Sequence, residues 1–307
     1  MSHPALRRGG ALLALLLAFT ACPTTMVGAE TPSSRTPQLA ATRPAKAAPR
    51  ARRHRAPRRP PGGVVWARNA ILLDPNTDSV LFEKNADDPA PIASLTKLMT
   101  ALVFLEQNPD LRRTAEVARD DLRGAGHTQL RNREVVPLYD LLHMSLMNSD
   151  NAATRVLVRE SGLERDAFID RMNRKARELG LANTRYFEVT GLDQRNVSTA
   201  TDVAKLLQTA ADNTLIRDIT TTDLYRFRTA RRQHQIVNTN RLLKSRSVEV
   251  SCGKTGFIIE AGYCVATWVR ARGRDMIAVV LGAPTNATRF ADVKRLIQHA
   301  EAPPTGI

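Results

Sequence analysis

The chain is poor in the residues from which metal sites are built. Among its 307 residues there are three cysteines and six scattered histidines, and the sequence has no C-x-x-C or H-x-x-x-H pair. Zinc sites usually draw their ligands from such closely spaced pairs. We therefore predict no metal ion.

Glycine-rich phosphate loops are absent as well. The sequence contains no G-x-G-x-x-G and no G-x-x-x-x-G-K string, so a nucleotide cofactor has no support. It also lacks G-x-S-x-G, the nucleophile turn of the α/β-hydrolases. We predict no cofactor, and any serine chemistry must use a different arrangement.

Long apolar runs are confined to the start of the chain. Residues 11–21 are apolar, two arginines precede them, and the small residues Val27-Gly28-Ala29 follow. The run is shorter than the ~20 residues that a membrane span needs. This pattern predicts a secretory signal peptide over residues 1–29, and therefore export to the periplasm. Cys22 leaves a lipoprotein as an alternative, which the bulky Phe19 disfavours.

Acidic residues are scarce, at 30 against 45 basic ones, which gives a net charge of +15. The imbalance is concentrated in residues 30–62, where nine basic residues face one acid among many prolines and alanines. Such a segment cannot bury a core, so we predict a disordered, extended linker. It is either a passive spacer or an attachment to anionic envelope polymers or lipid headgroups. Export argues against a nucleic-acid partner.

Three short motifs follow in order along the rest of the chain. They are Ser94-Leu95-Thr96-Lys97, Ser149-Asp150-Asn151 and Lys254-Thr255-Gly256. The first offers a nucleophile and a lysine, the second a hydroxyl and an amide, and the third a cation and a hydroxyl. Each motif alone is weak evidence. Together and in this order they indicate one serine acyl-transfer site.

Secondary structure separates the first motif from a decoy with the same spacing. Residues 94–106 have leucines three and four apart and are predicted to form a helix. Positions i and i+3 share a helix face, so Ser94 and Lys97 can meet. Ser251 and Lys254 have the same spacing, but residues 248–257 are predicted to form a strand. Those two side chains would therefore point to opposite faces.

The proposed chemistry assigns a task to each group of the first and third motifs. A serine hydroxyl is a poor nucleophile until a base removes its proton. Lys97 can be that base only when neutral, and burial together with the charge of Lys254 would lower its pKa. The backbone N–H groups of Ser94 and Phe257 are candidate donors to an oxyanion. Gly256 lets a substrate backbone lie against the strand.

Other candidate residues carry two interpretations each. Ser149 can relay a proton to the leaving amine and Asn151 can hold Lys97 and the substrate amide, but their motif could also be a helix N-cap. Thr255 is either an ordinary strand residue or a ligand to a substrate carboxylate. Arg289 is either a surface helix residue or a clamp for that carboxylate.

Strands are predicted at both ends of residues 63–302, with helices between them, and residues 303–307 form a short tail. We therefore expect an α/β (α+β) fold with an antiparallel sheet, made of N- and C-terminal strands, and helices on both faces. Cys252 and Cys264 fall on successive strands, as a disulfide or as two buried thiols. The predicted strands are 64–73, 79–83, 224–228, 235–237, 248–257, 263–270 and 276–281, and the helices are 94–106, 138–147, 152–160, 165–179, 203–211 and 289–299.

The segment 91–101 resembles the active-site segment of the low-molecular-mass penicillin-binding proteins, the D-alanyl-D-alanine carboxypeptidase family. Thr190-Gly191-Leu192, the segment 196–200, and Glu260-Ala261-Gly262 after the third motif fit the same family. The likeness covers about residues 64–297. It implies a β-lactamase/transpeptidase-like fold, peptidoglycan stem peptides as substrate and covalent inhibition by β-lactams.

The resemblance also implies roles for the matching residues. It makes Ser94 the nucleophile, Lys97 the base, Ser149 and Asn151 the second element, and Lys254 the third. The family's carboxylate-binding arginine before the last helix matches Arg289 only loosely.

Two departures from the family pattern concern a loop and the outline of the chain. Val189 stands where the family usually has proline. The chain stops at Ile307, without the second, all-β domain and the anchoring helix of typical carboxypeptidases. This outline, with the segment 260–264, resembles the periplasmic D-alanyl-D-alanine endopeptidases, which cut D-Ala–diaminopimelate cross-links. We expect an endopeptidase, with a carboxypeptidase as the alternative.

Two further functions fit the sequence less well. A class A β-lactamase needs E-x-x-L-N after the second motif, and the nearest string, residues 160–164, lacks the asparagine. A non-catalytic wall-binding protein held by the linker is the other alternative, but the three intact motifs argue against it.

Overall fold

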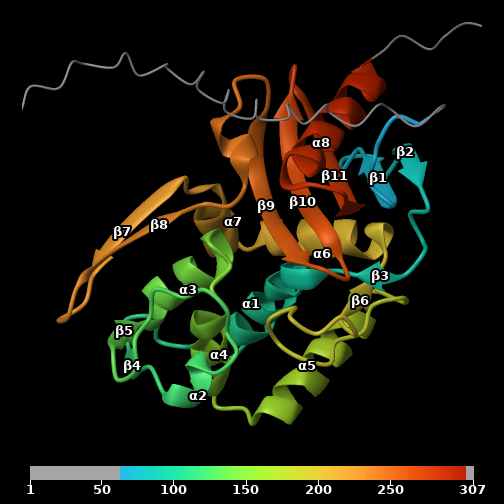
Figure 1. Ribbon diagram of the computed structural model, residues 1–307. Helices are drawn as coiled ribbons and strands as arrows, with labels where there is room; N and C mark the ends of the chain where they lie inside the picture. Colours follow the sequence, from blue (N-terminus) through green and yellow to red (C-terminus); the bar gives the residue numbers. More distant parts are fainter. Residues whose placement is uncertain (1–62, 302–307) are drawn as a thin grey trace, which may run out of the picture. The chain divides into compact units, whose positions relative to one another are not determined.

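The computed structural model describes residues 63–301, and the predictions for the signal peptide, the linker and the tail lie outside this range. A five-stranded antiparallel sheet has the order β2-β1-β11-β10-β9. Both ends of the described chain contribute to it (Figure 1), as predicted. The strands are β1 (Asn69–Leu73), β2 (Val80–Lys84), β9 (Glu249–Ile258), β10 (Gly262–Ala271) and β11 (Arg274–Ala283).

The central strands are hydrophobic on both faces because each face is covered. Alternate residues of a strand point to opposite sides of a sheet. Thus Ile71 and Val279 belong to one hydrophobic core, whereas Leu72 and Val280 belong to another. Such strands appear as near-continuous apolar runs in the sequence, as the burial of all five residues of β1 illustrates.

Helix α8 (Asn286–Glu301) packs on one face of the sheet through Phe290, Val293, Leu296 and Ile297. Helix α6 (Ala200–Asp212) covers the other face and joins the sheet to a helical part of the molecule. That part contains α1 (Thr96–Glu106), α3 (Leu138–Met147), α4 (Asn151–Arg159), α5 (Arg165–Glu178) and α7 (Thr214–Thr221). Helices thus lie on both faces of the sheet, as predicted.

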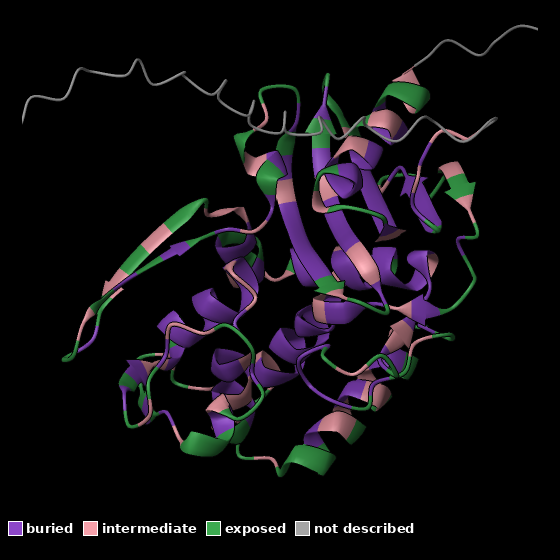
Figure 2. Ribbon diagram, viewed as in Figure 1, coloured by how far each residue is buried: buried purple, intermediate pink, exposed green. Residues whose placement is uncertain are grey.

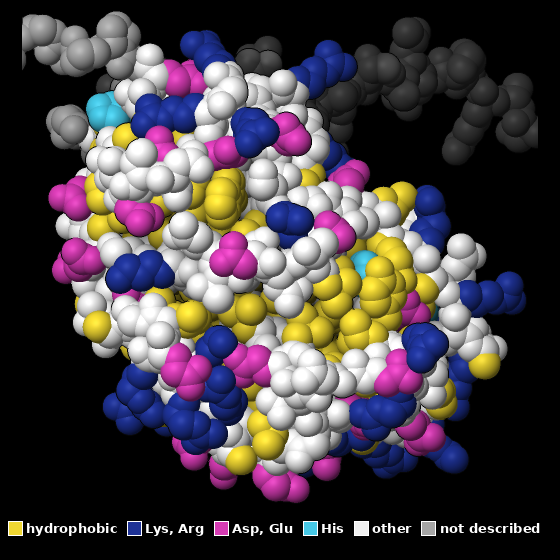
Figure 3. All heavy atoms as spheres, turned by 180° about the vertical axis from the view of Figure 1, so that it is seen from behind, with side chains coloured by type: hydrophobic (Ala, Val, Ile, Leu, Met, Phe, Trp, Pro, Cys, Tyr) yellow, Lys and Arg dark blue, Asp and Glu magenta, His cyan; other side chains and the backbone are white. Residues whose placement is uncertain are grey.

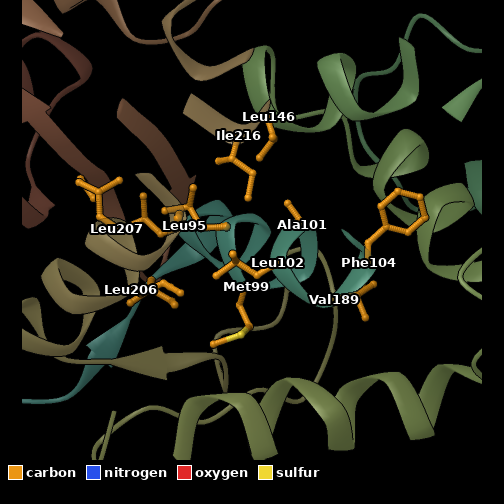
Figure 4. Packing of buried hydrophobic residues seen from close by; sticks show 14 of the residues in the cluster. Leu95, Met99, Ala101, Leu102, Phe104, Leu146, Val189, Leu206, Leu207 and Ile216 are labelled. Carbon is orange, nitrogen blue, oxygen red and sulfur yellow. The ribbon is translucent and has the colours of Figure 1, made fainter. Parts of the chain in front are cut away.

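Helix α1 lies in the middle of the larger core. Residues Thr96 to Phe104 are all buried, so the helix is surrounded rather than amphipathic. Figure 2 shows most of α1 and of the central strands in the colour of buried residues, whereas the edge strand β2 is intermediate or exposed. Figure 4 shows Met99, Leu102 and Phe104 among side chains of other helices, including Leu146, Leu206 and Ile216. Each such side chain contributes roughly 1.5–3 kcal/mol by burial, which makes α1 a rigid support for the residues at its start.

Local signals set the ends of two helices. Gly180, just after α5, has φ +67°, the left-handed conformation that ends many helices. The Thr199 side chain accepts a hydrogen bond from the Asp202 N–H at 3.0 Å, which makes it the N-cap of α6. The Asp202 carboxylate accepts from the Asn183 N–H at 2.8 Å and from the Thr184 hydroxyl at 2.9 Å, so it ties the start of α6 to the preceding loop.

Several short elements escaped prediction. Helix α7 was not predicted. The paired strands of only two or three residues are too short to show periodicity in the sequence. Within residues 63–301 no helix is long and apolar enough to cross a membrane. Strands β7 (Leu224–Arg228) and β8 (Gln233–Val237) pair with each other and confirm the strands predicted at 224–228 and 235–237. The other short elements are β3 (Ala90–Pro91) with β6 (Val197–Ser198), β4 (Thr114–Glu116) with β5 (Val135–Pro137), α2 (Arg119–Leu122), and the 3-10 turns η1 (Ala93–Leu95) and η2 (Arg241–Lys244).

The two cysteines of the sheet are free thiols. The register places Cys264 opposite Gly256 and Cys252 opposite Trp268, so the cysteines do not face each other across the strands. The disulfide alternative is therefore wrong, and both side chains fill buried positions. Burial raises the pKa of each thiol to about 11, which keeps them protonated and unreactive.

Hydrophobic and basic side chains gather in different areas of the molecular surface. Figure 3, seen from behind, shows a broad area of hydrophobic side chains across the middle of that face. Lys and Arg side chains gather at its lower left, toward the region where α5 lies.

Candidate active site

Ser94 lies in the 3-10 turn η1 that leads into α1, and Lys97 stands in the first turn of α1. Residues three apart nearly eclipse each other in such a turn. The Lys97 ammonium Nζ accordingly lies 3.0 Å from Ser94 Oγ, within hydrogen-bond distance. The predicted meeting of these two side chains is present in the structure.

Lys97 is fully buried and has no carboxylate within ion-pair distance among the described residues. Its Nζ donates to Asn151 Oδ1 at 2.6 Å and to the Thr190 carbonyl at 2.5 Å. Burial lowers the pKa of Lys97 to about 7, against the opposing charges of Glu188 and Asp150. Near neutral pH a large fraction of this amine is therefore uncharged and able to accept the serine proton.

The second motif occupies the connection between α3 and α4. Ser149 adopts φ +64°, a left-handed conformation that is uncommon for residues other than glycine. Asp150, rather than Ser149, is the N-cap of α4, because its carboxylate accepts from the Ala153 N–H at 3.0 Å. The cap thus uses only the middle residue of the motif. Asn151 is oriented by a 2.8 Å bond from its Nδ2 to the Ala125 carbonyl.

The third motif lies on the edge strand β9. Lys254 is buried, and its Nζ donates to Ser149 Oγ and to the Thr255 carbonyl, both at 2.9 Å. Burial, and secondarily the charge of Lys97, hold the pKa of Lys254 well below its usual range. The Thr255 hydroxyl is 2.6 Å from that of Thr239. Three segments far apart in sequence therefore converge on one cluster of hydroxyls and amines.

Two glycines allow the backbone to approach Ser94 closely. A β-carbon at Gly256 would lie 3.0 Å from the Ser94 nitrogen, and one at Gly191 would lie 1.9 Å from the Ala93 carbonyl oxygen. The Ser94 N–H belongs to the first turn of a helix, where backbone donors lack partners within the helix. Phe257 follows Gly256 on the same strand, and its N–H stays a predicted second oxyanion donor. Its side chain is 47 % exposed at the end of the strand.

Comparison with known proteins agrees with this geometry. The sequence profile of peptidase family S11, described as D-alanyl-D-alanine carboxypeptidase, matches residues 55–285. The D-alanyl-D-alanine endopeptidase of Pseudomonas aeruginosa is 36% identical over 238 residues, which cover 76% of each chain.

Two solved structures have a similar fold. The DD-transpeptidase of Streptomyces K15 has a TM-score of 0.73 and 27% identity, over 78% of this chain and 98% of that one. Penicillin-binding protein D2 of Listeria monocytogenes, in its cefotaxime-bound form, has a TM-score of 0.68 and 29% identity over the same shares.

The chain belongs to the S11 peptidase family. It is a serine-type D-Ala-D-Ala peptidase with the fold of the DD-transpeptidases and penicillin-binding proteins.

In this S11 peptidase Arg289 is buried, so the interpretation of Arg289 as a surface helix residue is wrong. It is 5 % exposed, and its Nη1 donates to the carbonyls of Gly256 and Cys264 at 2.9 and 3.0 Å. Burial lowers the pKa of Arg289 to about 10. The described contacts therefore tie α8 to the third motif and its neighbouring strand, while a role in binding a substrate carboxylate stays a prediction.

The loop around Thr190 contacts Lys97. The sequence pointed to this loop only through the resemblance of Thr190-Gly191-Leu192 to the penicillin-binding protein family. The Glu188 carboxylate accepts from the backbone N–H groups of Thr190 at 2.7 Å, of Leu192 at 2.9 Å, and of Gly191. These bonds fix the loop so that the Thr190 carbonyl faces Lys97. The Val189 carbonyl, at the position where the family usually has proline, accepts from the Thr100 hydroxyl at 2.7 Å. Proline would supply the same carbonyl, so this contact does not depend on which of the two residues is present.

Asn196 supports the same loop from its other end. Its Oδ1 accepts from the N–H groups of Phe187 and Glu188, at 2.7 and 3.1 Å, and its Nδ2 donates to the Thr96 hydroxyl at 3.1 Å. No spacing in the sequence marks Glu188 or Asn196 as special. A glutamate that binds backbone amides looks the same in sequence as one on the surface.

Proposed function

We propose that this S11 peptidase is an exported D,D-endopeptidase that cleaves D-Ala–diaminopimelate cross-links of peptidoglycan through an acyl-enzyme on Ser94. The observation that carries the proposal is the 3.0 Å contact between Ser94 Oγ and a fully buried Lys97 whose pKa is about 7. A buried amine that is partly neutral at working pH is the base that a serine nucleophile needs.

Acylation follows from the positions of the two lysines. Lys97 takes the Ser94 proton while Oγ attacks the D-Ala carbonyl carbon, and the developing oxyanion accepts from the Ser94 and Phe257 N–H groups. Each such donor is worth roughly 3 kcal/mol in the transition state. The C–N bond then breaks, and the proton that Lys97 took passes to the leaving amine through the Ser149 hydroxyl, which Lys254 contacts at 2.9 Å. Lys97 is thereby neutral again.

Deacylation reverses these roles with water as the nucleophile. A water molecule gives a proton to neutral Lys97 while its oxygen attacks the ester carbon. As the ester C–O bond to Ser94 breaks, Lys97 returns that proton to Ser94 Oγ and the acid product leaves. Asn151 contacts Lys97 at 2.6 Å, which supports its proposed role in holding that amine and the substrate amide.

The leaving amine distinguishes the two candidate activities. An endopeptidase releases the amine of a neighbouring stem peptide, whereas a carboxypeptidase releases free D-alanine. We favour the endopeptidase because the 36% identical relative is named as one. The carboxypeptidase stays the alternative because the matching family profile carries that description.

Digestion of purified muropeptides decides between them. We expect cross-linked dimers to be converted into monomers by the wild-type protein. If dimers stay intact while pentapeptide monomers lose D-alanine, the carboxypeptidase is the correct assignment. A Ser94→Ala variant should be inactive on both substrates.

β-Lactams should acylate the same serine, as the cefotaxime-bound form of the Listeria relative suggests. Mass spectrometry after benzylpenicillin treatment should show one adduct, on the peptide containing Ser94, that Ser94→Ala lacks. An adduct of equal yield on the variant would remove Ser94 from the mechanism, and no adduct on the wild type would support a non-catalytic protein.

A β-lactamase is less well supported. Glu160, in the string nearest to E-x-x-L-N, follows α4 and forms ion pairs with Arg113 at 2.9 Å and Arg159 at 2.6 Å. These two contacts occupy the carboxylate, whereas a deacylating base must be free to contact a water molecule. Rapid turnover of a chromogenic cephalosporin would reverse this ranking.

The basic segment of residues 30–62 is proposed to be a passive spacer, with attachment to anionic envelope polymers as the alternative. Its net charge of +8 comes from nine basic residues and one acid. If the segment is an attachment, deletion of residues 31–61 should weaken binding to isolated sacculi at low salt and leave turnover unchanged. Unchanged binding would make the segment a passive spacer.

A further inference from the structure

Two hollows adjoin each other beside the loop of residues 187–195. One measures about 520 Å³ and the other about 510 Å³, and both are lined by Arg155 of α4 and Arg165 of α5. We call the two together the arginine trough. The first hollow reaches Gly124, Leu192 and Glu260, and the second continues toward α2.

The arginine trough begins at the edge of the active site. Gly124 precedes Ala125, whose carbonyl orients Asn151, and Leu192 follows Gly191, which packs against Ala93 and the nitrogen of the nucleophile. Glu260 belongs to the turn between β9 and β10, just beyond the third motif. The active site and the trough therefore share the same two loops.

Two arginines of the trough carry charge that no described carboxylate neutralises. Within residues 63–301, neither Arg155 nor Arg165 has an acidic partner within ion-pair distance. Arg155 is anchored by Nη1, which donates to the Asp121 and Arg123 carbonyls at 3.3 and 2.5 Å. The other arginines around the trough are paired: Arg123 with Asp120, Arg159 with Asp121, and Arg195 with Asp193.

The trough also offers free carboxylates and apolar walls. Glu260 and Glu164 have no cationic partner among the described residues, whereas Glu188 is engaged by backbone N–H groups. Phe187 and Leu192 line the first hollow and are 36 and 39 % exposed. A ligand that fits would have an aliphatic chain ending in both a carboxylate and an ammonium group.

The sheet edge indicates which half of the substrate lies there. β9 is the edge strand of its sheet, so a peptide can add to it by backbone hydrogen bonds. A peptide that adds antiparallel, with its scissile carbonyl at Gly256, runs toward Ile258 and Glu260 on its N-terminal side. The acyl-donor stem, rather than the leaving amine, therefore extends toward the arginine trough.

We propose that the arginine trough binds the side-chain end of a diaminopimelate residue in the acyl-donor stem peptide. This inference rests on the proposed peptidoglycan substrate. Arg155 and Arg165 bind the side-chain carboxylate, Glu260 binds the ammonium group, and Phe187 and Leu192 cover the methylene chain. A lysine at the same position carries an ammonium group alone, so the two arginines disfavour it by repulsion.

The test uses synthetic cross-linked peptide dimers that differ only in the third residue of the donor stem, diaminopimelate or lysine. For the full-length wild-type protein, we expect kcat/KM to be about tenfold higher with diaminopimelate, the size expected for one charge-assisted contact. Arg165→Ala should remove most of this preference, because it raises KM for the diaminopimelate dimer and, by removing repulsion, lowers KM for the lysine dimer. Glu260→Gln should reduce the preference less, because the ammonium group is common to both dimers.

Arg174→Ala is the matched control, since Arg174 is also an exposed arginine of α5 and does not line the trough. Its preference should equal that of the wild type. Benzylpenicillin acylates Ser94 without a stem peptide, so its rate should be the same in all these proteins.

Equal kcat/KM for both dimers in the wild type, or an unchanged preference in Arg165→Ala, overturns the trough proposal and leaves the proposed function standing. Absence of both acylation and dimer cleavage in the wild type overturns the proposed function, and the trough proposal with it.

Discussion

Lys97 and Lys254 are both buried, and the positive charge of Lys97 lowers the pKa of Lys254. They reach the site from different elements, α1 and β9, and each contacts a serine hydroxyl, Ser94 and Ser149 respectively. Neither forms an ion pair within residues 63–301. Two unpaired buried cations are costly, so burial favours the neutral form of a lysine. A serine nucleophile requires such a neutral amine as its base.

The first prediction concerns the pH dependence of acylation. Lys97 is the proton acceptor only when neutral, and its pKa is about 7. We therefore expect the second-order rate constant for benzylpenicillin acylation to level off above pH 7 and to fall roughly tenfold per pH unit well below it. Stopped-flow measurements between pH 5 and 9 would check this. A flat profile across that range would exclude Lys97 as the titrating base.

The second prediction concerns stability, measured by comparing Lys97→Met with the wild type. The pKa of Lys97 is 10.5 as its ordinary value and about 7 in the folded protein. Between these values the unfolded chain binds the proton that the folded protein has lost. The unfolding free energy of the wild type should therefore rise with pH, relative to the variant, by up to about 1.4 kcal/mol per pH unit. Below pH 7 the difference should become constant.

Urea unfolding at pH 6, 7, 8 and 9 measures this difference directly. Curves for the two proteins that stay parallel at every pH would show that Lys97 keeps its proton on folding. The first prediction would then lose its basis as well, because both depend on the same titration.

The third prediction separates the hydroxyl of Ser149 from its backbone conformation. Ser149→Gly and Ser149→Ala both remove the proposed proton relay, so both should cleave dimers about 100-fold more slowly. The residue has φ +64°, which glycine adopts freely. Ser149→Gly should therefore be about 1 kcal/mol more stable than Ser149→Ala. Thermal unfolding tests the stability, and full activity in either variant would remove Ser149 from the mechanism.

Sequence could predict the parts of the site that depend on local geometry. The contact between Ser94 and Lys97 needs only one helical turn, and the helix was evident from its leucine spacing. Which of the two S-x-x-K strings can bring its serine and lysine together also followed from local structure, because Ser251 lies on β9, where residues three apart point to opposite faces.

Contacts between distant segments could not be derived in this way. The Thr190 carbonyl that accepts from Lys97 is 93 residues away along the chain. The Glu188 carboxylate that holds its loop has no periodic or spacing signal. Register is equally inaccessible, and it decided that Cys252 and Cys264 stay apart.

The last prediction tests how closely the loop of residues 187–195 must pack against the nucleophile. Gly191 and Gly180 both have positive φ, at +87° and +67°, but their surroundings differ. A β-carbon at Gly180 would have no neighbour within 4 Å, whereas one at Gly191 would lie 1.9 Å from the Ala93 carbonyl oxygen. Gly180→Ala should cost about 1 kcal/mol in unfolding free energy, from backbone strain alone, and leave acylation unchanged. Gly191→Ala carries the same strain and must also move backbone at Ala93 and Ser94, so it should cost at least about 3 kcal/mol and slow acylation by more than about 100-fold.

Urea unfolding and benzylpenicillin labelling of both variants measure the two effects. Equal losses of stability and normal labelling in both would mean that the loop can withdraw from Ser94 without consequence, and that the Thr190 carbonyl is not needed to position Lys97.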